Sequence, residues 1–203
     1  MKKMILSLGL LGLLSSAHAD LVKLNVDGGY TTVTMKDLND SLGAGSTGLN
    51  SGWYVGGEAT LGIIPLLEIG PRVEYLQTNT GSFGGNSVVG SLTSGMLGVN
   101  THFDLPLTGL GFGAGAFGGY GYATANVTPA SGSSFNGALY QGGGFVAEIE
   151  ARLSYSILPL TSLFLNGAFR FANVGTLKNG TTETGTVFDY SGLNLGGGLS
   201  IGF

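Results

Sequence analysis

Apolar and polar residues alternate with a period of two over most of the chain beyond residue 20. Between residues 67 and 76, for example, Leu67, Ile69 and Val73 occupy odd positions while Glu68 and Arg72 occupy even ones. Such alternation is typical of β-strands whose two faces lie in different surroundings. The pattern predicts an all-β protein with eight strands, at about 22–34, 53–63, 67–76, 88–103, 109–125, 143–155, 162–173 and 187–203.

Ten charged residues, from five of these segments, fall on one of the two faces. In the third and sixth segments every charge is even-numbered against odd-numbered apolar residues, and the charges of the first, second and seventh segments are likewise opposite in parity to the apolar residues. An Arg or Lys facing lipid near the bilayer midplane costs about 2 to 4 kcal/mol, so the charged face is predicted to line an enclosed lumen. The set is Lys23, Asp27, Glu58, Glu68, Arg72, Glu74, Glu148, Glu150, Arg152 and Arg170.

The connections between the segments are of two kinds. Three are short and share a Pro-Leu core, at residues 64–66, 105–107 and 158–160. Three short turns and four long loops join eight strands, and an even number lets the last strand pair antiparallel with the first. We therefore predict an eight-stranded antiparallel transmembrane β-barrel of up-and-down meander topology. The long loops are rich in Gly, Ser, Asn and Thr and are predicted at Lys36–Gly52, Gln77–Ser87, Asn126–Gly142 and Gly175–Thr186.

The N-terminal residues 1–19 have the features of a secretory signal peptide. Lys2 and Lys3 precede an apolar stretch over residues 4–14, and Ala17, His18 and Ala19 form a small-residue cleavage site. A membrane-spanning helix needs about 20 apolar residues, so this stretch is too short for one. We expect cleavage after Ala19, which leaves residues 20–203 as a single barrel domain.

Composition excludes several classes of function. Residues 20–203 carry six Lys and Arg against 12 Asp and Glu, so no basic patch is available for nucleic acid. The chain has 39 glycines, only 10% charged residues and no Cys, so it has neither an acylated cysteine anchor nor disulfide bonds. With one His beyond residue 20 and no Cys, we expect neither a metal site nor a cofactor.

The chain ends in an alternating segment, residues 193–203, that finishes on Phe203. This ending resembles the closing strand of bacterial outer-membrane barrels, and the whole of residues 20–203 is similar to the small eight-stranded proteins of the OmpA, OmpX and OmpW type. The resemblance implies an outer-membrane location, with turns in the periplasm and loops outside. It also implies a terminal Phe203 read by the barrel assembly machinery, and contact with bilayer lipid and lipopolysaccharide. We expect a monomer, and no peptidoglycan-binding domain after Phe203.

An eight-stranded barrel has an interior just wide enough for side chains to fill it. The Glu and Arg side chains of the charged set are therefore expected to form a charge-paired plug, which is a structural core or, alternatively, a gate. Because these Glu outnumber the Arg by five to three, at least one Glu should hold a proton, a water molecule or Lys23 as its partner.

Glycines occupy the lumen face of two segments. They are Gly111, Gly113, Gly115, Gly119 and Gly121 around Phe117, together with Gly196 and Gly198. A face of glycine indicates close approach by something large, either charged side chains from other strands or the contents of a narrow pore. Two functions follow: a closed barrel with a structural or surface-interaction role, or a narrow channel for small solutes or apolar compounds.

Catalysis is not expected. Barrel enzymes that act on lipid A place a His beside a Ser at the outer-leaflet end, whereas His102 lies beside Phe103 and Asp104 at a predicted periplasmic turn. The aromatic residues near the strand ends are better explained as membrane-interface girdles. They are Tyr30, Trp53, Tyr75, Tyr120 and Tyr122 toward the loops, and Phe103, Tyr155 and Phe203 toward the turns.

Overall fold

The computed structural model describes residues 21–41, 48–64, 66–83, 85–131 and 137–203. The predicted signal peptide, with its cleavage site at Ala19, lies outside the described residues and stays a prediction. The elements are β1 (Val22–Thr32), α2 (Lys36–Ser41), β2 (Ser51–Ile64), β3 (Leu67–Thr78), β4 (Gly81–Phe83), β5 (Asn86–Asp104), β6 (Leu110–Thr128), β7 (Ala138–Leu158), β8 (Thr161–Asn179), β9 (Thr182–Asp189) and β10 (Gly192–Gly202). Within the described residues, no helix is long and apolar enough to span a membrane.

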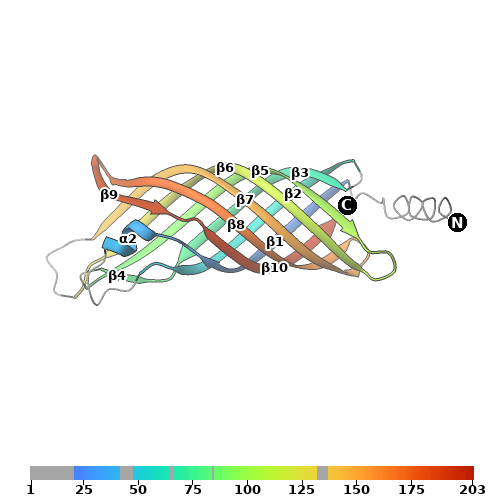
Figure 1. Cartoon of the computed structure of the whole chain (residues 1–203), viewed down its shortest axis with the longest axis horizontal. Helices are drawn as coiled ribbons and strands as arrows, with labels where there is room; N and C mark the ends of the chain where they lie inside the picture. The colour runs from blue at the N-terminus through green and yellow to red at the C-terminus, as the bar shows by residue number, and fades with distance from the viewer. Residues whose placement is uncertain (1–20, 42–47, 65, 84, 132–136) are drawn as a thin grey trace.

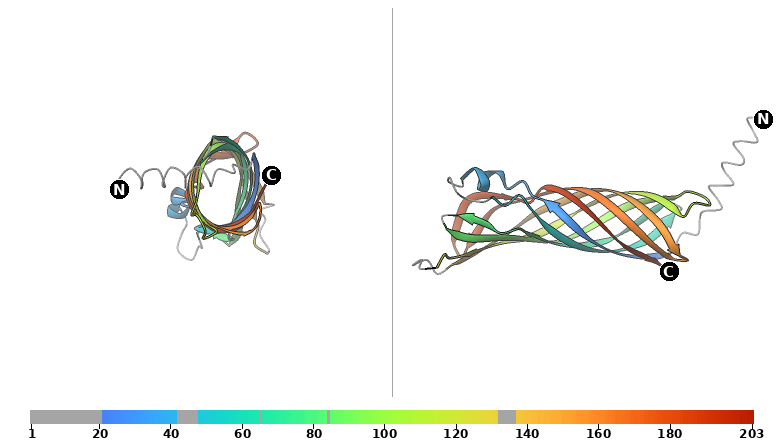
Figure 2. Two further views of the ribbon diagram at one scale, coloured as in Figure 1. Left: turned by 90° about the vertical axis from the view of Figure 1, so that its right-hand side faces the viewer. Right: turned by 90° about the horizontal axis from the view of Figure 1, so that it is seen from below.

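The strands form a closed antiparallel ring in the order β10, β1, β2, β3, β5, β6, β7, β8 and back to β10 (Figure 1, Figure 2). The seam between the first and last strands runs from Lys23↔Gly202 to Thr31↔Asn194, and beyond it Phe203 N–H donates to the Val22 carbonyl at 2.9 Å. Closure leaves no unpaired sheet edge along the ring. The predicted eight-stranded antiparallel barrel with sequential neighbours is confirmed.

Strand ends toward the loops differ from the sequence-based bounds. The predicted loops at Asn126–Gly142 and Gly175–Thr186 were too long, because β6 and β7 extend into the first and a β8–β9 hairpin fills most of the second. β9 and β10 continue as one ladder against β8, since Tyr190 N–H donates to the Ala172 carbonyl at 2.9 Å between them. Backbone pairing between the strands continues beyond the apolar outer surface that faces lipid. There the outer face of a strand meets water and need not be apolar, so the apolar alternation is not required.

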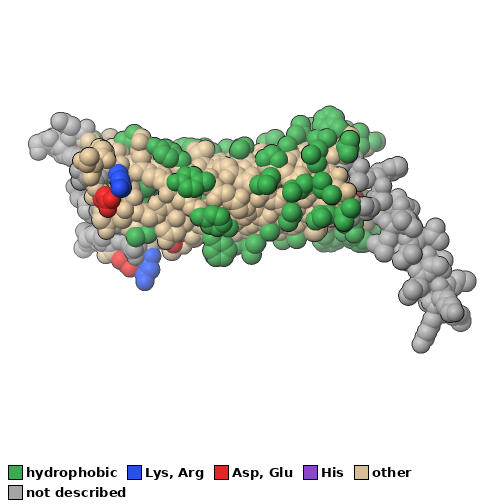
Figure 3. Space-filling view, turned by 90° about the horizontal axis from the view of Figure 1, so that it is seen from above, with side chains coloured by type: hydrophobic (Ala, Val, Ile, Leu, Met, Phe, Trp, Pro, Cys, Tyr) green, Lys and Arg blue, Asp and Glu red, His purple; other side chains and the backbone are tan. Residues whose placement is uncertain are grey.

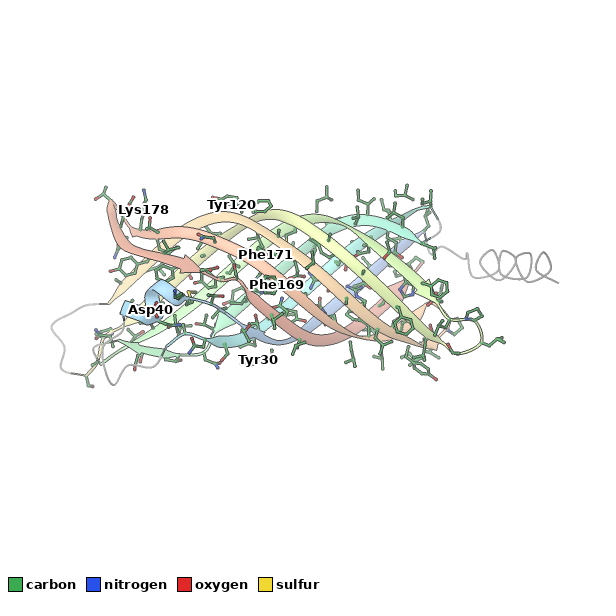
Figure 4. All side chains as sticks on the ribbon, in the orientation of Figure 1. Tyr30, Asp40, Tyr120, Phe169, Phe171 and Lys178 are labelled. Atoms are coloured by element: carbon green, nitrogen blue, oxygen red, sulfur yellow. The ribbon has the colours of Figure 1, made fainter. Side chains whose placement is uncertain are left out.

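The four strands β5 to β8 are about twice as long as a membrane requires. They have 19, 19, 21 and 19 residues, whereas a tilted transmembrane strand needs about 9 to 11. The aromatic side chains of Tyr30, Tyr120, Phe169 and Phe171 lie near the middle of the long axis rather than at the loop end (Figure 4). The loop-side half of the barrel therefore projects beyond the apolar band as a collar of paired strands.

The outer surface is apolar over the turn-side half of the molecule (Figure 3). Val73, Leu97, Ile149, Leu165 and Leu195 each point outward with more than half of their surface exposed. On β3, β7 and β8 the charged residues Arg72, Glu148 and Arg170 are buried on the opposite face. An apolar outer surface is stable in contact with lipid hydrocarbon but not in contact with water, so this half is the membrane-spanning part.

Polarity is reversed in the collar. Its outer face carries exposed polar residues such as Asn126, Gln141 and Asn173. A cluster of buried apolar side chains lies on the other side, at the loop end of the charged lumen; we call it the upper core. The upper core includes Val33, Met35, Leu49, Leu76, Leu92, Ala123, Val146, Ala172, Val174, Leu177, Phe188 and Tyr190. The β1–β2 connection contributes Val33, Met35 and Leu49, and its helix α2 lies beside the ring rather than across it (Figure 2).

The three short turns share an unusual backbone conformation. Leu66, Leu107 and Leu160 have φ values of 73°, 66° and 65°, in the left-handed region that disfavours residues with a side chain. At the central turn Thr108 N–H donates to the Leu105 carbonyl at 3.4 Å, and a positive φ at the third residue fits a type II turn. Each leucine thus stands where Gly or Asn is the usual residue.

Replacing Leu107 tests this strain. Leu107 is fully exposed and packs against nothing, so Leu107→Asn should raise the free energy of unfolding by up to about 1 kcal/mol, because Asn tolerates the left-handed region. Leu107→Val should lower it, since β-branched residues are least tolerated there. Equilibrium unfolding in urea of barrels refolded into detergent micelles gives both values. A less stable Asn variant would show that the leucine side chain outweighs the strain.

Candidate functional site

The middle of the lumen is built around the guanidinium of Arg72 on β3. Five carboxylates lie within 4.0 Å of it, from β1, β2, β3 and β7. The shortest contacts are to Asp27 at 3.0 Å and to Glu150 at 3.1 Å. The others, at 3.5 to 3.9 Å, are to Glu148, Glu74 and Glu58. The ring of Phe117 faces the same guanidinium at 5.4 Å, so Arg72 is enclosed on all sides.

Two further arginines extend this network along the lumen. Toward the turns, Arg152 contacts Glu150 at 2.6 Å and Glu58 at 3.1 Å and stacks over the Phe164 ring at 4.3 Å. Toward the loops, Arg170 pairs with Glu74 at 3.0 Å and donates to the Tyr190 carbonyl. We call these three arginines, with Asp27, Glu58, Glu74, Glu148 and Glu150, the charged belt.

Neutral side chains that the sequence analysis did not single out tie the charged belt together. Asn166 donates to both Asp27 and Glu150, at 3.0 and 3.1 Å. Asn194 donates to both Glu74 and Glu148, and Asn100 and Asn25 donate to Glu58. The sequence places these asparagines on the same strand face as the charged residues. It does not distinguish them from other polar residues on that face, because an amide carries no charge.

Lys23 and Glu68 form a separate ion pair near the turn end, with 2.6 Å between Nζ and Oε1. They line a cavity of about 240 Å³ that opens at that end and is floored by Glu150 and Arg152. His102 also lines it, and its Nε2 lies 2.8 Å from Asp104 Oδ1. The cavity thus ends at the charged belt. The Lys23–Glu68 ion pair lies at its open end.

The lumen-facing glycines accommodate neighbouring side chains. A Cβ on Gly121 would lie 2.7 Å from Val146 Cγ2 and 2.8 Å from Leu92 Cδ1. A Cβ on Gly198 would lie 2.6 Å from the Phe164 ring. These neighbours are aliphatic and aromatic, whereas a Cβ on Gly111 would meet Ser154, and one on Gly113 would lie 3.7 Å from the Cβ of Arg152, one of the expected charged side chains. Glycine is required here because the interior is narrow and larger residues from adjacent strands fill it.

Tyr190 crosses the lumen at the loop end of the charged belt. Its backbone carbonyl accepts from Arg170, while its hydroxyl donates to the Thr124 carbonyl of β6 at 3.0 Å. Tyr190 is fully buried, and Leu76 and Leu92 of the upper core are buried as well. Charged and apolar side chains therefore fill successive levels of the interior.

Solved structures with the same architecture are known. The crystal structure of Neisserial surface protein A matches with a TM-score of 0.55 at 18% identity, covering 90% of this chain and 97% of that one. A major outer membrane protein from Thermus thermophilus matches with a TM-score of 0.57 at 13% identity, covering 90% and 99%. This chain has the fold of the small outer-membrane β-barrel proteins. No protein-family model matches the chain, and neither does any curated protein.

For this barrel, the contacts of Arg72 predict a large effect of its removal. Arg72→Ala leaves five buried carboxylates without their shared cation and should lower the free energy of unfolding by at least about 3 to 5 kcal/mol, or prevent refolding. The control is Lys178→Ala, which removes an exposed ion pair with Glu183 and should change stability by less than about 1 kcal/mol. Unfolding in urea after refolding into lipid vesicles measures both. Equal stability of the two variants would contradict the central role of Arg72.

Proposed function

We propose that this chain is a non-enzymatic outer-membrane barrel with a closed interior, which presents its loop-side collar for interaction at the cell surface. The fold supports the location, and the filling of the lumen carries the rest of the proposal. The charged belt and the upper core occupy successive levels of the interior. A barrel closed in this way acts through its outer surfaces.

The two ends of the barrel differ in surface polarity, as a role in surface interaction at the loop end requires. The β8–β9 hairpin at the loop end exposes the ion pair of Lys178 and Glu183, with more than half of each side chain in solvent. The turn end exposes apolar residues such as Leu107, Leu160 and Phe203. In the proposed orientation the collar faces the exterior, within the lipopolysaccharide layer, and the turns face the periplasm. Assembly through Phe203 and a monomeric state belong to the same proposal.

The competing function is a narrow channel for small solutes or apolar compounds. The cavity at the turn end is the observation that favours it, because its opening gives solutes access to Arg152 and Glu150. A channel further requires a path past Arg72 and through the upper core. A solute could pass only if side chains of the charged belt and of the upper core moved aside.

Conductance of the refolded protein in planar lipid bilayers decides between the two functions. We expect an inserted protein without discrete current steps. Protection of the barrel from added protease would show that the silent protein is inserted. Current steps in the wild type that change in Arg152→Ala or Glu150→Gln would overturn the closed barrel and support a channel through the charged belt.

Orientation is tested by single-cysteine labelling, for which the absence of Cys from the chain provides a clean background. In intact cells a membrane-impermeant maleimide should label Lys178→Cys at the loop end and should leave Leu107→Cys at the turn end unmodified. After permeabilisation of the outer membrane both should react, since both side chains are exposed. Labelling of Leu107→Cys in intact cells would reverse the proposed orientation.

A further inference from the structure

The charged belt contains more negative than positive side chains. Its carboxylates are Asp27, Glu58, Glu74, Glu148 and Glu150, and its guanidiniums are Arg72, Arg152 and Arg170. Each of these carboxylate side chains has no more than 2% of its surface exposed. With every group ionised, the belt would hold two uncompensated negative charges at membrane depth. An interior of low dielectric constant opposes such an excess strongly.

Four of the five carboxylates accept a hydrogen bond from a guanidinium. Arg72 donates to Asp27 at 3.0 Å and to Glu150 at 3.1 Å. Arg152 donates to Glu58 at 3.1 Å and to Glu150 at 2.9 Å. Arg170 donates to Glu74 at 3.0 Å. Charge-assisted bonds of this kind stabilise the ionised form of each acceptor.

Glu148 is the exception. Its Oε2 accepts from the neutral amide of Asn194 at 3.2 Å, and its Oε1 has no hydrogen-bond partner among the described residues. The nearest cationic atom is Arg72 Nε at 3.5 Å, which makes no hydrogen bond to it. The residue as a whole is 1% exposed. Glu148 is therefore a buried carboxyl without a charge-assisted bond, in a cluster that already has excess negative charge.

The groups packed around Glu148 on each strand add to this imbalance. From β3, Glu74 shares the Asn194 amide with it, so that two carboxylates converge on one donor. From β8, Arg170 lies opposite in the strand register, but its donors bond to Glu74, Asn194, Thr31 and the Tyr190 carbonyl. From β6 the neighbour in register is the uncharged Phe117, and on β7 itself the next inward residue is Glu150.

We propose that the charged belt is a proton-binding site and that Glu148 carries the proton. Uptake of one proton from water forms the O–H bond of a neutral carboxylic acid and reduces the excess charge of the belt by one. The neutral form needs no guanidinium, which leaves Arg72 to Asp27 and Glu150. This goes beyond the proposed closed barrel, because it makes a bound proton part of what holds the interior together.

Infrared spectroscopy of the refolded barrel, with Glu148→Gln and the control variant Glu183→Gln, tests the site directly. At neutral pH the wild type should show the C=O stretching band of a buried protonated carboxylic acid. The band should be lost in Glu148→Gln, which keeps the size and neutrality of the group, and kept in Glu183→Gln, which changes an exposed carboxylate outside the charged belt. Absence of the band from the wild type, or its persistence in Glu148→Gln, would overturn the assignment.

The dependence of stability on pH gives a second, independent measurement. The folded wild type holds one more proton than the unfolded chain, so stability falls as pH rises until the folded state also releases it. In that range the unfolding equilibrium constant should increase about tenfold per pH unit relative to Glu148→Gln. Parallel pH dependence of the two proteins would reject the proposal. So would stability that follows sodium concentration, with choline as the control cation, because that would identify a metal cation in place of the proton.

Discussion

Backbone hydrogen bonding between β10 and β1 is the constraint on which the rest of the structure depends. Inside hydrocarbon every N–H and C=O must be paired within the protein, and a sheet achieves this only when its first strand meets its last. Closure with eight strands leaves one narrow interior and one lipid-facing surface. Each residue of the membrane-spanning half must then face one or the other, which is why Val73 is outside and Arg72 is inside on the same strand.

The narrow interior explains why the charged belt takes the form it does. Side chains that enter from β1, β2, β3, β7 and β8 have no solvent to reach and meet near the axis, so one guanidinium comes to contact five carboxylates. A network of this kind is weak evidence for net stabilisation, because desolvation offsets much of the attraction. Its geometry nevertheless constrains the register of distant strands, because Arg152 and Glu58 can bond only when β7 and β2 are correctly staggered.

The reversal of polarity between the two halves has the same origin. Outside the apolar band the strands continue to pair, but their outer face meets water and carries Asn126 and Asn173. The interior of this half can then be apolar, and Leu76, Leu92 and Val146 pack there as in a water-soluble barrel. The interior thus passes from an open polar cavity to buried ion pairs and then to an apolar core, which separates the two ends of the molecule.

Local sequence by itself determined the strand type, the number of strands in the ring and the face of the ten charged side chains assigned to the lumen. Period-two alternation and the Pro-Leu turns are short-range features, and the cost of a charge in lipid turns parity into an inside and an outside. The tertiary structure decided which charges meet, because Arg72 and Asp27 are 45 residues apart and Arg152 and Glu58 are 94 apart. Their contact depends on the stagger of strands around the ring. The length of the collar and its apolar interior also required the three-dimensional structure, because they follow from where the membrane ends and not from a local repeat.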